Sequence, residues 1–351
     1  MLTAVVATAV SASGLTAWQD PGVVEINRYP MTTTFNTGGM NLSLNGEWDF
    51  KWYETLEDRA LDFFKPEYTV EGWDKMPVPG LWELNGYGDP LYVNIGYPWR
   101  TWYKNNPPVV PVERNHAGQY RRTFTIDEAW DGKDIFLHIG SATSNVRVWI
   151  NGKEVGYSED SKLEARFDIT KYVRKGENLI ALEIFRWCDG TYLEDQDFFR
   201  FTGLARDTYI SSREKKRIED INVTASADGK ADVKIELTKG VTSVQLEILD
   251  PSGKSVVSRT VPVKANVRSQ RGLPVINTSL DVESPKLWTA ETPWLYTLKV
   301  ASYDKKGQTE AASIERPQAS GWELSRSFLQ AGSPSRRRAP SSGCRCWRRS
   351  P

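Results

Sequence analysis

The clearest structural signal in this chain is the run Val146-Arg147-Val148-Trp149-Ile150-Asn151-Gly152-Lys153-Glu154-Val155-Gly156-Tyr157. Apolar residues alternate along its first five positions, which is typical of a strand with one buried face. Asn151-Gly152 follows directly, and both residues tolerate the positive φ angles of a type I′ turn. The run therefore predicts a β-hairpin.

The same alternation recurs on both sides of this hairpin. It appears in residues 135–139 and 180–184, where every second residue is apolar. No amphipathic helix longer than about ten residues is indicated, and the strand–helix–strand spacing of a parallel sheet is missing. These patterns predict an all-β fold.

A charged stretch, residues 211–217, predicts a boundary between two domains. About 100 residues follow it with a turn every 8–12 residues, which is typical of an immunoglobulin-like sandwich. Their predicted strands are Ile221–Ala225, Ala231–Leu237, Val244–Leu249, Ser255–Val261 and Leu295–Val300. The longer, tryptophan-rich part upstream suits a jelly-roll sandwich. We assign residues 18–213 to the jelly roll and 214–314 to the immunoglobulin-like domain.

Composition excludes several classes of function. The 351 residues hold 45 Lys and Arg against 45 Asp and Glu, and this zero net charge argues against a nucleic-acid partner. Only two histidines occur, His116 and His138. A Ser-His-Asp triad or a histidine-rich metal site is therefore not expected, because each depends on histidine side chains. His138 is expected to be a surface-facing or hydrogen-bonded strand residue. Cys188 is the single cysteine before the C-terminal segment, so no disulfide framework is expected there.

The first 17 residues resemble a secretory signal, with an apolar run followed by small residues. This pattern predicts export to the periplasm or the extracellular space, and a short buried strand is the alternative. No other stretch approaches the ~18 apolar residues that a membrane span needs. We therefore expect no membrane span.

The C-terminal segment, residues 315–351, differs in composition from the rest. From Pro317 onward it holds seven arginines, one acidic residue and no lysine, a net charge of +6, so residues 1–316 carry −6. Such a segment cannot bury enough apolar surface to order itself. It is either a basic tail or, as we favour, a frame-shifted end.

Seven motifs occur in an order that resembles one enzyme family. They are Leu44–Phe50, Val78–Glu83, Tyr92–Trp99, Gly118–Phe124, Trp149–Lys153, Phe185–Arg200 and Leu287–Tyr296. Together they resemble the non-catalytic N-terminal half of family 2 glycoside hydrolases, and Phe185–Arg200 is similar to the β-galactosidase branch. The resemblance spans roughly residues 20–315.

The resemblance implies a function for three residues. In that family, the position matching Asp197 contacts the galactosyl group and helps to hold a sodium ion, and Asn94 and Ile95 match a loop that lines the same pocket. Both catalytic glutamates lie in a barrel that follows these domains, so no catalytic residue is assigned here. The implied partners are β-galactoside sugars and the missing barrel, with oligomers in the intact enzyme. Sodium, and magnesium in the intact enzyme, are the implied cofactors; neither is expected to be held by this chain alone.

The acidic cluster Glu194, Asp195 and Asp197 has two interpretations. A retaining glycosidase needs two carboxyl groups about 5–5.5 Å apart, and this cluster could supply them. In an extended segment, Asp195 and Asp197 would point to one side and Glu194 to the other. The alternative, which we favour, is that these carboxylates hydrogen-bond the backbone of nearby loops.

The tryptophans also have two interpretations, since an indole can stack on a sugar ring or fill a core. We expect Trp48, Trp149 and Trp187 in the core. Trp99 and Trp102, in a loop, are expected to be exposed.

These inferences favour the N-terminal portion of an exported β-galactosidase, without turnover of its own. One alternative is a stand-alone carbohydrate-binding module that uses Asn94, Asp197 and the exposed tryptophans. Another is a non-catalytic scaffold that complements a separately encoded barrel.

Overall fold

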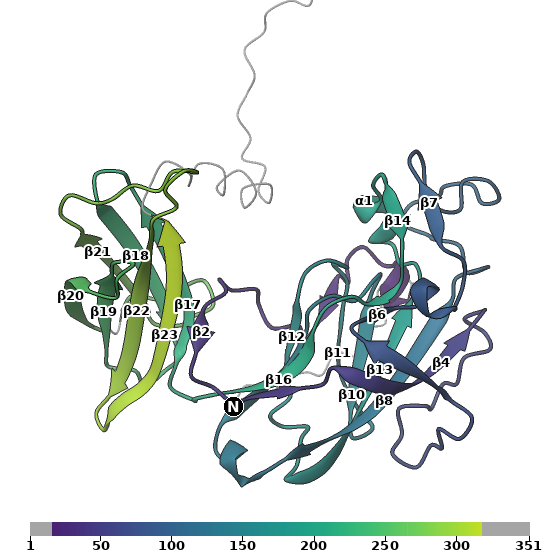
Figure 1. Ribbon diagram of the computed structural model, residues 1–351. Helices are drawn as coiled ribbons and strands as arrows, with labels where there is room; N and C mark the ends of the chain where they lie inside the picture. The colour runs from purple at the N-terminus through teal and green to yellow at the C-terminus, as the bar shows by residue number, and fades with distance from the viewer. Residues whose placement is uncertain (1–15, 265, 318–351) are drawn as a thin grey trace, which may run out of the picture.

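The computed structural model describes residues 16–264 and 266–317, which form two β-sandwiches joined by a short connection (Figure 1). Helical structure is limited to η1 (Ala17–Gln19), η2 (Glu83–Asn85), η3 (Glu128–Trp130) and α1 (Thr191–Glu194) in these residues. The predicted all-β fold, a jelly roll followed by an immunoglobulin-like sandwich, is confirmed. Most of the signal-like segment and nearly all of the basic C-terminal segment lie outside the described residues.

The first sandwich packs a large sheet against a smaller one. In spatial order, the large sheet holds β1 (Glu25–Ile26), β11 (Lys153–Ser158), β10 (Val146–Ile150), β13 (Gly176–Phe185), β8 (Ala117–Ile126), β4 (Gly46–Tyr53) and β5 (Asp74–Val78). The smaller sheet holds β12 (Ala165–Asp168), β9 (Asp134–Ile139), β16 (Thr208–Arg213) and β3 (Asn41–Ser43). Two short ribbons pair β14 (Phe198–Arg200) with β7 (Leu91–Val93) and β15 (Gly203–Leu204) with β6 (Gly80–Leu81).

The predicted hairpin joins β10 and β11. Asn151 and Gly152 have φ angles of 51° and 79°, as a type I′ turn requires. Their alternating neighbours bury one face against the core, where Val148 and Ile150 are fully buried. The hairpin is therefore confirmed.

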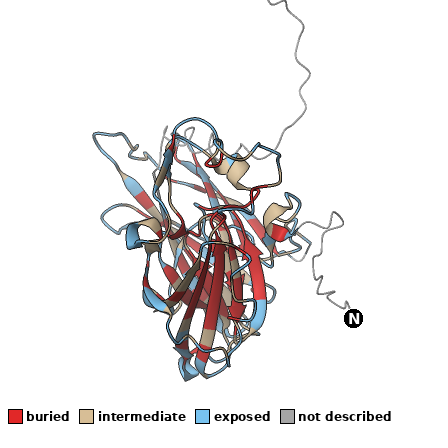
Figure 2. Cartoon of the chain, turned by 90° about the vertical axis from the view of Figure 1, so that its right-hand side faces the viewer, coloured by how far each residue is buried: buried red, intermediate tan, exposed pale blue. Residues whose placement is uncertain are grey.

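The core of the first sandwich combines aliphatic side chains with several aromatic ones, and buried residues gather along the strands while exposed ones gather in the loops (Figure 2). Trp48, Trp149 and Trp187 are buried, as predicted. The expected exposure of Trp99 is wrong, because its loop folds back and its ring packs edge-on against Trp187, with 5.3 Å between the ring centroids. Trp102 is half-buried beside them.

The second sandwich packs a three-stranded sheet, β17 (Ile218–Ala225), β18 (Lys230–Leu237) and β21 (Val275–Asp281), against a five-stranded one. In spatial order, the latter holds β2 (Asn36–Thr37), β23 (Gly307–Pro317), β22 (Leu295–Asp304), β19 (Ser243–Leu249) and β20 (Ser255–Pro262). All five predicted strands are present. β21 and β23 were not predicted, and β23 extends pairing three residues past the predicted boundary at residue 314.

A segment near the N-terminus crosses between the two sandwiches (Figure 1). β1 and β3 pair within the first sandwich, but β2 between them pairs with β23 of the second. The backbone N–H of Thr33 also donates to the Asp220 carboxylate at 2.8 Å. Residues 27–40 therefore tie the two domains together, which the sequence alone did not indicate.

A buried ion-pair network lies at the same junction. Arg217 is 4% exposed and pairs with Asp134 of the first sandwich and with Glu219 of the second, both at 2.5 Å. The Tyr29 hydroxyl, from the crossing segment, donates to Glu219 at 2.8 Å. One buried cation thus connects both domains and the segment that crosses between them.

Candidate functional site

The ribbon β7/β14 brings together the residues for which the sequence predicted a sugar site. Val93 pairs with Phe198, so Asn94, which follows Val93, and Asp197, which precedes Phe198, lie opposite each other at one end of the ribbon. The ribbon projects from the first sandwich on the side away from the second (Figure 1). Residues far apart in the sequence therefore share one exposed tip.

The side chains at this tip are open to solvent. Asn94 and Asp197 are exposed, and Ile95 is 74% exposed. The Tyr92 hydroxyl donates to the Asp197 carboxylate at 2.5 Å, and this hydrogen bond raises the pKa of Tyr92. The Arg100 guanidinium donates to the Ile95 carbonyl and so holds the loop that follows. Tyr92 fixes the orientation of Asp197, a role that the sequence analysis did not assign to it.

The acidic cluster does not form a pair of neighbouring carboxylates. Glu194 accepts a hydrogen bond from the Ser161 backbone N–H at 2.9 Å, and Asp195 forms an ion pair with Arg200. The extended backbone considered for this segment is wrong at Glu194, because residues 191–194 form the short helix α1. The three acids point to three different partners, which favours the structural interpretation of Glu194 and Asp195.

The tip offers only part of a cation site. A hard cation takes several oxygen ligands, and carboxylate and amide oxygens suit it. Asp197 and Asn94 are of that type, but Asp195 is already neutralised by Arg200. Among the described residues no group of three or more His, Cys, Asp and Glu side chains is arranged to hold a metal ion. A sodium ion here would need further oxygens from elsewhere.

A buried acid pair lies beneath the segment that leads to Asp197. Glu159 and Asp189 are 6% and 7% exposed, and the Tyr157 hydroxyl donates to Glu159 at 2.7 Å. Burial, with a contribution from the neighbouring Asp189 carboxyl, raises the pKa of Glu159 to about 8, and burial also raises the pKa of Asp189. Glu159 also lies against Gly190, the residue before α1.

We expect this pair to make the fold less stable in mild alkali. A carboxyl whose pKa is higher in the folded chain than the unfolded value, about 4.3, stabilises the fold while it is protonated. That stability is full below the unfolded value and is lost as the pH rises through about 8. The melting temperature should therefore be lower at pH 9 than at pH 6.

Substitution Glu159→Gln should flatten this dependence, because the amide keeps the acceptor for Tyr157 but cannot ionise. The matched control is Glu177→Gln, at an exposed position in β13 of the same sandwich. Equal pH profiles for the native chain and Glu159→Gln would contradict the assignment.

His138 is a hydrogen-bonded strand residue, as expected. Its Nδ1 lies 2.9 Å from the Glu164 carboxylate and its Nε2 lies 2.8 Å from the Ser211 hydroxyl. His116 Nδ1 lies 2.8 Å from the Glu54 carbonyl, and burial lowers the pKa of its ring. Neither histidine lies at the ribbon tip. Among the described residues, no helix is long and apolar enough to cross a membrane.

Two successive β-sandwiches are the arrangement that the comparisons with known families match, as accessory domains of a glycoside hydrolase. Two family models match: the sugar binding domain of glycosyl hydrolases family 2 over residues 42–213, and a second model of glycosyl hydrolases family 2 over residues 216–316. The chain belongs to glycoside hydrolase family 2, and its described residues hold these two domains without the catalytic barrel.

Curated relatives are similar over most of this chain. A β-galactosidase of Priestia megaterium is 37% identical over 286 residues, which are 78% of this chain and 27% of the relative. A β-galactosidase of Staphylococcus xylosus is 37% identical over 82% of this chain and 27% of its own length. The chain thus spans about a quarter of the length of these relatives.

Solved structures share the fold. A family 2 glycosyl hydrolase of Bacteroides cellulosilyticus has a TM-score of 0.56 and 21% identity, over 79% of this chain and 36% of that one. A β-glucuronidase of Bifidobacterium dentium has a TM-score of 0.59 and 17% identity, over 82% and 49% respectively. At this identity the likeness concerns the fold alone.

Proposed function

We propose that this chain is the sugar-binding and immunoglobulin-like portion of an exported β-galactosidase, which hydrolyses terminal β-D-galactosides. The ribbon tip would form one wall of the galactoside pocket, beside a catalytic barrel that carries the reacting carboxylates. In this proposal the described domains position the sugar and have no turnover by themselves.

The observation that carries this proposal is the meeting of Asn94 and Asp197 at the end of β7 and β14. A carboxylate accepts hydrogen bonds from sugar hydroxyls, and an amide both donates and accepts them. Ile95 adds an exposed apolar side chain that could pack against the C–H face of the sugar. Asp197 would also give one oxygen to a sodium ion, whose remaining ligands would come from the barrel and from water.

The test uses a chimera in which residues 18–317 of this chain replace the matching part of the Priestia megaterium relative. The chimera should hydrolyse an aryl β-galactoside, whereas the chain by itself should not. Asp197→Ala in the chimera should lower kcat/KM by at least about tenfold, because it removes a contact to the bound sugar.

The matched control is Asp58→Ala. Asp58 is also exposed and also accepts a hydroxyl hydrogen bond, from Thr55 at 2.7 Å, but it lies outside the ribbon. Hydrolysis by the chain alone would refute its proposed lack of turnover, and equal kcat/KM values for Asp197→Ala and Asp58→Ala would refute the proposed role of the tip.

A further inference from the structure

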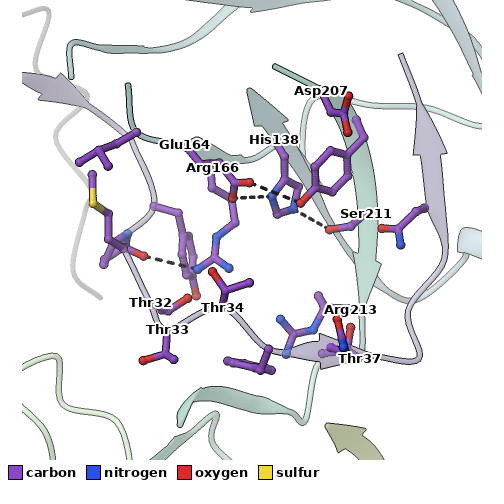
Figure 3. A pocket seen from close by; sticks show the side chains of 18 of the residues that line it. Thr32, Thr33, Thr34, Thr37, His138, Glu164, Arg166, Asp207, Ser211 and Arg213 are labelled. Carbon is purple, nitrogen blue, oxygen red and sulfur yellow. Dashed lines mark hydrogen bonds and ion pairs between the residues drawn. The ribbon is translucent and has the colours of Figure 1, made fainter. Parts of the chain in front are cut away.

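A polar cavity of about 720 Å³ lies between the crossing segment and the outer face of the sheet β12-β9-β16-β3 (Figure 3). The crossing segment supplies Thr32, Thr33 and Thr34, and the sheet supplies Asn41, His138 and Tyr209. A cavity of this size falls within the range of small-molecule sites. It shares no lining residue with β7, β14 or the ribbon tip.

The floor of the cavity is preorganised. His138 is 8% exposed, and hydrogen bonds to Glu164 and Ser211 fix both of its ring nitrogens (Figure 3). The Tyr209 ring stacks on it, with 4.3 Å between the ring centroids and 7° between the planes. The sheet therefore presents the Tyr209 ring, held in place by the buried His138 beneath it, among hydroxyl and amide groups, and this ring needs no reordering to receive a ligand.

The charged groups around the cavity are already satisfied by the protein. Glu164 lies against His138, Arg213 forms two hydrogen bonds to Glu310, Asp207 accepts from Asn45, and Arg166 lies over the rings of Tyr29 and Phe136. A ligand does not need to bring a charge of either sign. The groups left to meet it are threonine hydroxyls, an exposed amide at Asn41 and aromatic surface.

We propose that this cavity binds a neutral mono- or disaccharide, at a site separate from the ribbon tip. Hydroxyl and amide groups both donate and accept, as sugar hydroxyls do, and aromatic rings receive the C–H faces of a sugar. The crossing segment would close over the sugar from the side opposite the sheet. The inference does not rest on the proposed galactosidase activity.

The test is calorimetric titration of the full chain with lactose. Binding in the millimolar range is expected, and Tyr209→Leu and Asn41→Ala should each weaken it at least about tenfold. Tyr209→Leu removes the half-buried ring that faces the cavity, and Asn41→Ala removes an exposed amide without touching the core.

Two variants serve as controls. Tyr303→Leu changes a half-buried strand tyrosine of the second sandwich that hydrogen-bonds Gln245, and Asn222→Ala changes an exposed strand asparagine there. Both should bind lactose as the native chain does. Asp197→Ala, which removes the tip carboxylate, serves only to locate the bound sugar.

Three results would overturn the inference. One is no lactose binding up to about 50 mM, far above the expected millimolar Kd. Another is loss of binding in Asp197→Ala with retention in both Tyr209→Leu and Asn41→Ala, which would place the sugar at the tip. The third is binding of glucuronate in place of lactose, which would show that the ligand is charged. Failure of the chimera to hydrolyse galactosides leaves this inference unaffected, so the two proposals fail separately.

Discussion

Replacing Gly118 with alanine is expected to destabilise the first sandwich by about 3 kcal/mol, at the upper end of the cost of overpacking a core. Gly118 is the second residue of β8 and pairs with Trp52 of β4 on one side and Ile184 of β13 on the other. A Cβ atom there would lie 2.2 Å from the Trp82 ring and 2.9 Å from the Phe50 ring.

Neither ring can move away easily. Trp82 is 1% exposed and its indole N–H donates to the Tyr120 hydroxyl at 2.5 Å, and Phe50 is fully buried. β8 is held by strands on both sides, so the backbone cannot yield either. The cost is a large part of the total stability of a domain, about 5–15 kcal/mol.

The measurement is the free energy of unfolding in urea, with unfolding monitored by tryptophan fluorescence. Gly38→Ala is the matched control, because no atom lies within 4 Å of its would-be Cβ. The control should stay within about 0.5 kcal/mol of the native chain. Equal unfolding midpoints for the two variants would show that the core near Trp82 is not closely packed.

Replacing Arg217 with methionine is expected to cost about 3–5 kcal/mol, because it leaves a buried carboxylate without its main counter-charge. Glu219 is 3% exposed and would keep only Tyr29 and the longer contact to Arg271, at 3.4 Å. Asp134 would lose its link to the second sandwich.

The pH dependence gives an independent readout. Burial alone would raise the pKa of Glu219, but the Arg217 charge and the Tyr29 hydrogen bond outweigh it, so the pKa is lowered. A lowered carboxyl pKa stabilises the fold above the unfolded value, and this stability is lost as the pH falls through the folded pKa. The native chain should lose this contribution in acid, and Arg217→Met should show less of that loss.

Two further variants complete this test. Lys175→Met breaks an exposed ion pair with Glu128 and should cost no more than about 1 kcal/mol. Adding Glu219→Gln to Arg217→Met should restore part of the lost stability, since it removes the buried charge. A cost for Arg217→Met equal to that of Lys175→Met would contradict the role of the network.

The nine strands that local sequence patterns predicted are all present, among 23 in the described residues. The hairpin at Asn151-Gly152 formed because its turn depends on only two residues. The strands around Ile180 and Ile221 follow from alternation, which reports one buried face. β23 escaped prediction because its residues, such as Ala311 and Ala312, alternate only weakly in hydrophobicity.

The candidate site was predicted only through resemblance. Nothing local to Asn94 or Asp197 indicates that they meet, and the acidic cluster pointed as much to a catalytic pair as to loop contacts. The register of β7 and β14 brings Asn94 and Asp197 close together. The contacts of Glu194 with Ser161 and of Asp195 with Arg200 argue against the interpretation of the cluster as a catalytic carboxylate pair. The assignment of Asn94, Ile95 and Asp197 to sugar stays a prediction.

The sequence by itself determined the all-β class, the two sandwiches and their order, because alternation and turn residues act over a few neighbouring positions. Only the tertiary structure decided how distant segments meet. It placed β2 on the second sandwich, buried Trp99, joined the domains through Arg217 and formed the cavity above His138. Each of these depends on packing between residues far apart in the chain, which no local period of hydrophobicity encodes.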